Sequence, residues 1–186
     1  MAINSLGPTL ETERLILRPP VSEDFEPYAQ LMANEATARF IGGVQLRSVA
    51  WRGFMTVAGA WAMQGFSFFT VVEKATGQWV GRAGPWHPEG WPGTEVGWSL
   101  GAGFQGKGYA TEAASAAIDW AFDHLGWSDV IHCIDPDNLA SQAVAARLGS
   151  VNRGRGQMPP PYQASPIDVW GQTKDQWRTR LKPRYG

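Results

Sequence analysis

The chain has 186 residues, 16 Lys and Arg against 17 Asp and Glu, and a net charge of −1, so it offers no electrostatic footprint for nucleic acid or an anionic membrane. Its length suits a single domain over residues 1–186, with a core that needs neither disulfides nor metals. The lone Cys133 cannot form an internal disulfide, and residues 1–8 lack the basic start and apolar core of a signal peptide, which predicts a cytoplasmic protein.

The first half of the chain predicts a strand, two helices and a hairpin. Residues 10–18 alternate apolar and polar side chains and stop at two prolines, as a strand does. Ser22 followed by two acids is a helix-start signal and predicts a helix to about Ala33, and apolar spacing predicts a second helix over 47–63. Aromatic and β-branched runs over 66–73 and 78–86 predict two antiparallel strands joined by a turn.

One uncharged stretch, residues 53–72, is 20 residues long and approaches the length of a bilayer span. Its glycines and polar residues argue against a membrane helix. We interpret it as the end of an amphipathic helix, broken at Gly65, followed by a strand.

The second half predicts alternating strands and helices. A strand over 95–100 leads through four glycines in eight residues to an alanine-rich helix over 108–125. A strand over 130–134, a helix over 139–148 and final strands over 151–155 and 167–172 follow. The strand–helix–strand series predicts a parallel pair in the middle of the sheet. We therefore expect an α+β fold whose mixed, mostly antiparallel sheet contains a central parallel pair and is flanked by helices.

The glycine loop predicts an anion site, because its backbone N–H groups converge at the N-terminus of a helix. Gly101, Gly103 and Gly106 also spell G-x-G-x-x-G, and Asp135 ends the next strand where a dinucleotide fold places its ribose-binding acid. Too few strand–helix units follow for a doubly wound sheet, which disfavours that alternative. A nucleoside triphosphate loop fails because Gly108 stands where a Ser or Thr should meet magnesium.

Four segments in order carry a family resemblance. Gln105–Ala110 matches the Q-x-x-G-x-A motif of the GNAT acetyltransferase superfamily. Leu10–Arg18 resembles the opening of the branch that includes the ribosomal-protein alanine N-acetyltransferases, and Asn138, Ser141 and Leu148-Gly149 fall at that branch's N-x-x-S and L-G spacings. The chain is similar to this family over almost its whole length.

The resemblance implies acetyl-CoA as the donor, with no metal. Its pantetheine arm would lie between splayed strands over 95–100 and 130–134, and Ser99 and Asn138 would contact it. Its pyrophosphate would lie on the amides of the glycine loop, since backbone N–H donors suit pyrophosphate whatever the side chains are. These loop residues are Gln105, Gly106, Lys107, Gly108, Tyr109 and Ala110.

In this family the acceptor amine attacks the thioester directly, which requires a base, an oxyanion donor and an acid. For the base we select Glu95, acting through water, with a purely structural strand-end carboxylate as the alternative. The oxyanion donor is expected to be a backbone N–H near Ser99 or Leu100. Many relatives carry a Tyr as the acid where this chain has Ala145, so Ser141 is our candidate, with a helix-start serine as its alternative.

The acceptor is expected to be a primary amine, either a peptide N-terminus or a small molecule. Three connections, residues 39–43, 86–93 and 157–166, would surround it with aromatic and apolar surface rather than an acidic trough. We expect no nucleic-acid or membrane partner and allow for a homodimer. Because Ala145 replaces the Tyr, the protein could be a CoA-binding module without catalytic activity. The G-x-G-x-x-G spelling leaves a dinucleotide-binding oxidoreductase as a further alternative.

Overall fold

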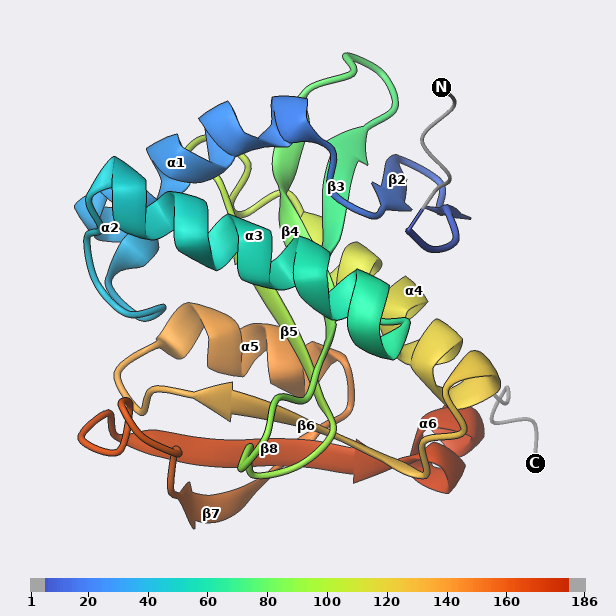
Figure 1. The fold of residues 1–186 in the computed structure, drawn as a ribbon. Coiled ribbons are helices and arrows are strands. Elements are labelled where there is room, and N and C mark those ends of the chain that lie inside the picture. The colour runs from blue at the N-terminus through green and yellow to red at the C-terminus, as the bar shows by residue number, and fades with distance from the viewer. Residues whose placement is uncertain (1–5, 181–186) are drawn as a thin grey trace.

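The structure is a computed structural model, in which residues 6–180 are described (Figure 1). One sheet of eight strands has the order β1-β2-β3-β4-β5-β6-β8-β7. Its strands are β1 (Leu10–Glu11), β2 (Leu15–Arg18), β3 (Phe69–Glu73), β4 (Trp79–Trp86), β5 (Glu95–Leu100), β6 (Asp129–Ile134), β7 (Val151–Gly156) and β8 (Ile167–Thr173). Every neighbouring pair is antiparallel except β5 and β6. The mixed sheet with a central parallel pair is therefore confirmed, and a doubly wound parallel sheet of the dinucleotide-binding kind is excluded.

Helices cover the sheet in two groups. They are η1 (Ser22–Asp24), α1 (Phe25–Ala33), α2 (Glu35–Ala38), α3 (Arg47–Gln64), α4 (Tyr109–His124), α5 (Leu139–Arg147) and α6 (Lys174–Arg180). Helix α1 packs on α3, whereas α4 packs on β2, β4 and β5. Figure 1 shows α1, α2 and α3 together in the upper half, and α5 beside β6 and β8 in the lower half. Strand β5 passes between these halves.

Small side chains let α4 approach the sheet closely. Ala113, Ala114, Ala117 and Ala121 are all fully buried. They pack with Val96 of β5 and neighbouring apolar side chains in the core. The alanine-rich face predicted from the sequence is thus the contact face of this helix.

Some boundaries differ from those predicted. The first strand is interrupted between β1 and β2 by a turn in which Thr12 Oγ1 accepts the N–H of Leu15 at 3.0 Å. The predicted helix from Ser22 begins with the 3₁₀ turn η1. The Ser22 hydroxyl donates to Glu23 Oε2 at 3.0 Å and does not cap the helix, whereas Asp24 Oδ2 accepts the N–H of Val21 at 2.9 Å. Helices α2 and α6 were not predicted, because each has only one or two turns of weak periodicity.

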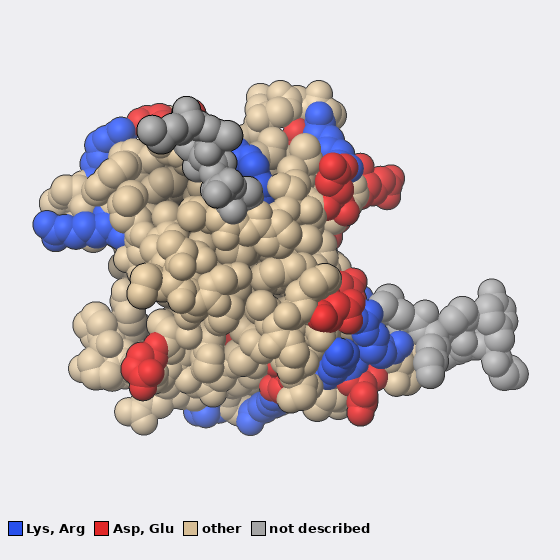
Figure 2. Space-filling view, turned by 45° about the vertical axis from the view of Figure 1, so that its right-hand side comes forward, with Lys and Arg blue, Asp and Glu red and all other residues tan. Residues whose placement is uncertain are grey.

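The uncharged stretch 53–72 has the predicted form. Helix α3 ends at Gly65, whose φ of 79° is a left-handed conformation that favours glycine, and β3 follows. Within residues 6–180 no helix is long and apolar enough to cross a membrane. Figure 2 shows charged side chains at the margins of one face and an uncharged centre, so neither sign dominates that face.

The parallel pair is joined by backbone pairing at one position and by side chains beyond it. The ladder register pairs only Glu95 with Ile131. In a continuing parallel ladder, the N–H of Cys133 would next bond the carbonyl of Val96. Instead Cys133 N–H donates to Glu95 Oε1 at 3.0 Å, and the Val96 carbonyl lies 2.6 Å from Nδ1 of His132. Two side chains therefore replace the ladder where the strands part.

A buried polar network fixes His132 in this position. Because the Val96 carbonyl can only accept, Nδ1 carries the proton and Nε2 accepts from the Ser150 hydroxyl at 2.9 Å. Gln172 Nε2 donates to Ser150 Oγ at 2.9 Å and to the Leu148 carbonyl at 2.9 Å. Ser150 thus links β6, β8 and the end of α5.

This network predicts an acid-sensitive contribution to stability. Burial lowers the pKa of His132 from its ordinary 6.5 to about 4. Between these values the unfolded chain binds a proton that the folded chain does not. Stability from this site is therefore complete above pH 6.5 and is lost as the pH falls towards 4, by on the order of 3 kcal/mol.

We expect His132→Gln to retain a donor for Val96 and an acceptor for Ser150 without titrating. The measurement is the free energy of unfolding in urea at pH 7.5, 6.0, 5.0 and 4.5 for both proteins. The wild type should lose more stability than the variant as the pH falls. Parallel pH profiles would show that His132 titrates normally in the folded chain.

Candidate active site

Glu95 is a buried carboxyl group at the parting of β5 and β6. Its side chain is 6% exposed, with Oε1 bound by the N–H of Cys133 and Oε2 bound by Trp91 Nε1 at 2.5 Å. Burial raises the pKa of Glu95 to about 7, although these two donors favour the charged form. A carboxyl group that changes charge near neutral pH can take a proton from a substrate.

Aromatic rings line the side of Glu95 away from α4. Trp91 meets Trp86 edge to face at 6.4 Å between ring centroids, and Trp86 stacks on Phe68 at 5.4 Å. A Cβ on Gly97 would lie 3.1 Å from Phe68 and 3.6 Å from Glu95 Oε1, so the absent side chain leaves room for this ring beside the carboxylate. The rings of Phe68, Trp86 and Trp91 thus form one continuous row of contacts.

The direction of the β5 amides distinguishes Leu100 from Ser99. Gly101 N–H donates to the Val80 carbonyl of β4 at 2.9 Å. Because amide direction alternates along a strand, the N–H of Ser99 also points to β4, whereas that of Leu100 points to the β6 side. No ladder pair from β6 reaches Leu100. Its N–H therefore faces the space between the parted strands.

The glycine loop presents a row of unpaired amides. Among residues 6–180 no hydrogen-bond acceptor is found for the backbone N–H groups of Gln105 to Ala110. Gly106 and Gly108 have φ values of 76° and 83°, which favour glycine and turn the chain into α4. Nothing lies within 4 Å of a Cβ built on Gly106, so the loop is open to a ligand there. This geometry fits a pyrophosphate.

The start of α4 is held from the opposite side by Arg14. Its Nη1 donates to the Lys107 carbonyl at 3.0 Å, and its Nε donates to Glu112 Oε2 at 2.7 Å. The guanidinium also lies 4.6 Å from the ring centroid of Tyr109, whose hydroxyl bonds Glu73. The Tyr109 side chain is therefore structural, while its backbone belongs to the loop. The Lys107 side chain is exposed and lies over Phe104.

Helix α5 begins with the predicted Asn138 cap. Asn138 Oδ1 accepts the N–H of Ser141 at 3.1 Å. The Ser141 side chain is half-buried, and its hydroxyl has no hydrogen-bond partner among residues 6–180. Ala145 is fully buried. Ser141 thus has a hydroxyl without a described partner on the first turn of α5, one turn before Ala145.

The remaining candidates have structural roles or stand apart. Burial of the thiol raises the pKa of Cys133, so this cysteine is a poor nucleophile. Asp135 Oδ1 accepts the N–H of Asp137 at 2.8 Å and forms a turn. His87 is exposed, and no hydrogen bond or ion pair joins it to Glu95 within residues 6–180. No group of three or more metal-ligating side chains occurs in residues 6–180.

Sequence reasoning missed three participants of this region. Trp91, considered only as part of an aromatic group, is a hydrogen-bond donor to Glu95. His132 and Arg82 were not singled out, since each is one polar residue in a strand with no motif around it. Their positions follow from two things together: side chains alternate between the two faces along β4 and β6, and the strand register sets which residues lie opposite each other. A Cβ on Gly90 would lie 3.3 Å from Pro159, so two of the predicted acceptor-side connections do meet.

Comparison with known proteins identifies the family. Residues 14–151 match the model of the acetyltransferase (GNAT) domain. Protein YkkB of Bacillus subtilis is 34% identical over 87 residues, which cover 46% of this chain and 51% of YkkB. The N-acetyltransferase p20 of Bacillus licheniformis is 27% identical over 136 residues, covering 72% of this chain and 76% of p20. The chain thus spans about half of the first relative and three quarters of the second.

Solved structures agree with this assignment. The acetyltransferase of Agrobacterium tumefaciens has a TM-score of 0.78 and 33% identity, over 90% of this chain and 95% of its own. The ribosomal-protein-S5-alanine acetyltransferase of Vibrio fischeri has a TM-score of 0.71 at 22% identity, over 91% of this chain and 98% of its own, which shows the shared fold. Since the family model covers more than half of the sequence, the chain belongs to the GNAT acetyltransferase family.

Proposed function

We propose that the protein transfers the acetyl group of acetyl-CoA to a primary amine by direct attack. The observation that carries this proposal is the position of Glu95, a carboxyl group of pKa about 7 buried where β5 and β6 part. The amine nitrogen forms a bond to the thioester carbon, and the carbon–sulfur bond breaks. The amine loses a proton, and the departing thiolate gains one. Family membership supports acetyl-CoA as the donor.

The donor is held in two places. The amides of Gln105 to Ala110 bind its pyrophosphate, because unpaired N–H groups at a helix N-terminus favour a negative charge. Its pantetheine arm lies beside Ser99 and the Asn138 cap, between the parted strands. Leu100 N–H stabilises the oxyanion that forms on the thioester carbonyl, since this amide points to the β6 side and has no ladder partner.

Proton transfer is assigned to two side chains. Glu95 receives the ammonium proton, directly or through a water. Ser141 supplies a proton to the leaving thiolate and recovers it from solvent, which its half-buried, unpartnered hydroxyl supports. A primary amine on a peptide or a small molecule reaches Glu95 along the aromatic surface of Phe68, Trp86 and Trp91.

We expect Glu95→Gln to lower kcat/KM by about 100- to 10,000-fold, the usual contribution of a general base. In the wild type the rate should rise with pH through about 7, because the carboxylate is the active form, and then level off. The variant should lack this rise. Free thiol release from acetyl-CoA, measured between pH 5.5 and 9 with a panel of amines and N-terminal peptides, tests both points.

The matched control is Asp175→Asn, which makes the same kind of change at an exposed position of α6. It should leave the rate and its pH dependence unchanged. An unaltered pH profile in Glu95→Gln would remove Glu95 from the mechanism.

We expect Ser141→Ala to lower kcat by at least about tenfold while the Kd for CoA changes little, because the hydroxyl acts on the leaving group. The N–H of residue 141 remains available to Asn138, so the helix start is retained. Turnover and calorimetric CoA binding give the two quantities. Ser22→Ala, at an exposed serine, is the control. Weaker CoA binding with unchanged kcat would make Ser141 a binding residue.

A further inference from the structure

Arg82 is a cation on β4 that forms no ion pair within residues 6–180, although its charge acts on Glu95 and partly offsets the rise that burial causes in the pKa of that carboxyl group. Its side chain is half-buried, its Nε atom is buried without a hydrogen-bond acceptor, and no carboxylate among residues 6–180 pairs with it. The guanidinium instead lies 4.6 Å from the ring centroid of Phe68 and 5.3 Å from that of Tyr28. Burying part of a charge without a counter-ion is unfavourable, so this arrangement favours an anion from outside the chain.

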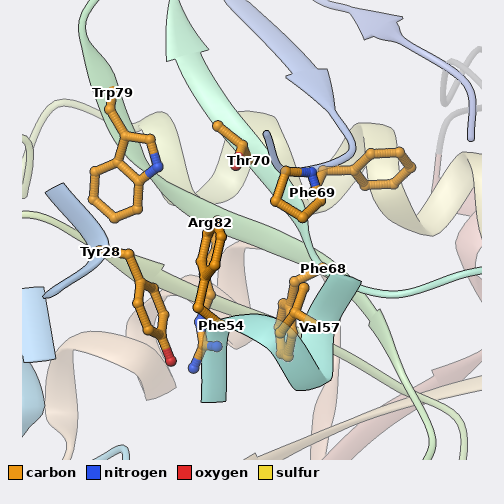
Figure 3. A pocket seen from close by; sticks show the side chains of 9 residues that line it. Tyr28, Phe54, Val57, Phe68, Phe69, Thr70, Trp79 and Arg82 are labelled. Atoms are coloured by element: carbon orange, nitrogen blue, oxygen red, sulfur yellow. The ribbon is translucent and has the colours of Figure 1, made fainter. Parts of the chain in front are cut away.

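A small pocket surrounds this cation. Side chains of α1, α3, β3 and β4 line it, among them Tyr28, Phe54, Phe68 and Arg82. Its free volume is about 20 Å³, little more than a single water molecule needs. Figure 3 shows the guanidinium of Arg82 and the hydroxyl of Tyr28 at the same end of the pocket, away from Trp79. The Tyr28 hydroxyl also has no hydrogen-bond partner among the described residues. The Arg82 guanidinium and the Tyr28 hydroxyl are therefore two hydrogen-bond donors without described acceptors at one end of the pocket.

The pocket and the proposed base share one face of the sheet. Arg82 pairs with Ser99, and Trp86 pairs with Glu95 four residues further along β4. Side chains two and four residues apart on a strand point to the same face, so Arg82 and Glu95 lie on one face with their Cα rows roughly 13 Å apart. Phe68 lies over Gly97 between them. A molecule that reaches both groups would have an apolar middle along this ring.

We propose that the acceptor amine carries a carboxylate, which Arg82 and Tyr28 bind while the amine lies at Glu95. A planar guanidinium pairs with a carboxylate through two parallel hydrogen bonds. This inference rests on the proposed function, since it names the substrate class of the same site. It makes Arg82 the residue that selects the acceptor.

The experiment compares ω-amino acids from β-alanine to 6-aminohexanoate with their primary amides. In each pair the amine is the same and only the charge at the far end differs. In the wild type at low ionic strength, kcat/KM for the best carboxylate should exceed that of its amide by about 10- to 100-fold. Arg82→Gln should remove this preference, mainly by raising KM for the carboxylate. Arg82→Lys should restore part of it.

Arg52→Gln is the matched control, because Arg52 is an exposed arginine on α3 that no described carboxylate binds. It should leave the preference unchanged. Equal wild-type rates for acid and amide, or an equal loss of both in Arg82→Gln, would overturn the inference. Weaker CoA binding in Arg82→Gln with the carboxylate preference intact would also overturn it, by assigning Arg82 to the donor.

Binding separates this inference from the proposed function. The shift in melting temperature with each acid and amide is measured without acetyl-CoA, so it does not need turnover. If no amine causes thiol release from acetyl-CoA but the ω-amino acids bind and this binding depends on Arg82, the proposed function fails and the carboxylate site stands. If thiol is released but no acid binds better than its amide, the carboxylate site fails and the proposed function stands.

Discussion

The parting of β5 and β6 is the constraint on which the site depends. A parallel ladder that continued past Glu95 and Ile131 would pair the amides and carbonyls that face the other strand and leave no space between the strands. Instead, the Glu95 carboxylate accepts the N–H of Cys133, and the His132 ring donates to the carbonyl of Val96. These are the backbone donor and acceptor that the interrupted ladder leaves unpaired. Because buried backbone groups must be paired, these two side chains make the gap energetically acceptable.

Glu95 therefore has a structural role, and in the proposed function the same side chain also has a chemical role. Its Oε1 accepts a backbone N–H in place of a carbonyl, which positions the carboxyl group and helps to remove it from water. The same burial raises its pKa to about 7. His132, on the other strand, has the opposite shift from the same cause, since burial disfavours the charged form of either group. One environment thus yields a carboxyl group able to titrate near neutral pH and an imidazole that stays neutral.

The glycine loop is held from the N-terminal part of the chain. Arg14 binds the carbonyl of Lys107, 93 residues away, and Glu112 on the first turn of α4. These contacts use carbonyl and side-chain groups, so the N–H groups of the loop are left unpaired. This explains why the opening segment and the Q-x-x-G-x-A motif, far apart in sequence, both carried the family resemblance. The opening segment holds the glycine loop in position through Arg14.

The sequence by itself determined most of the fold and located the glycine loop and the Asn138 cap. Glu95–Leu100 was predicted with its observed bounds, and the loop, α4 and the Asn138 cap followed because they depend on local periodicity, glycine conformation and helix capping. Only the tertiary structure revealed the bonds of Glu95 to Trp91 and Cys133, the His132–Ser150–Gln172 network and the unpaired Arg82. Burial, strand register and side-chain pairing depend on residues distant in the chain, so no local pattern specifies them.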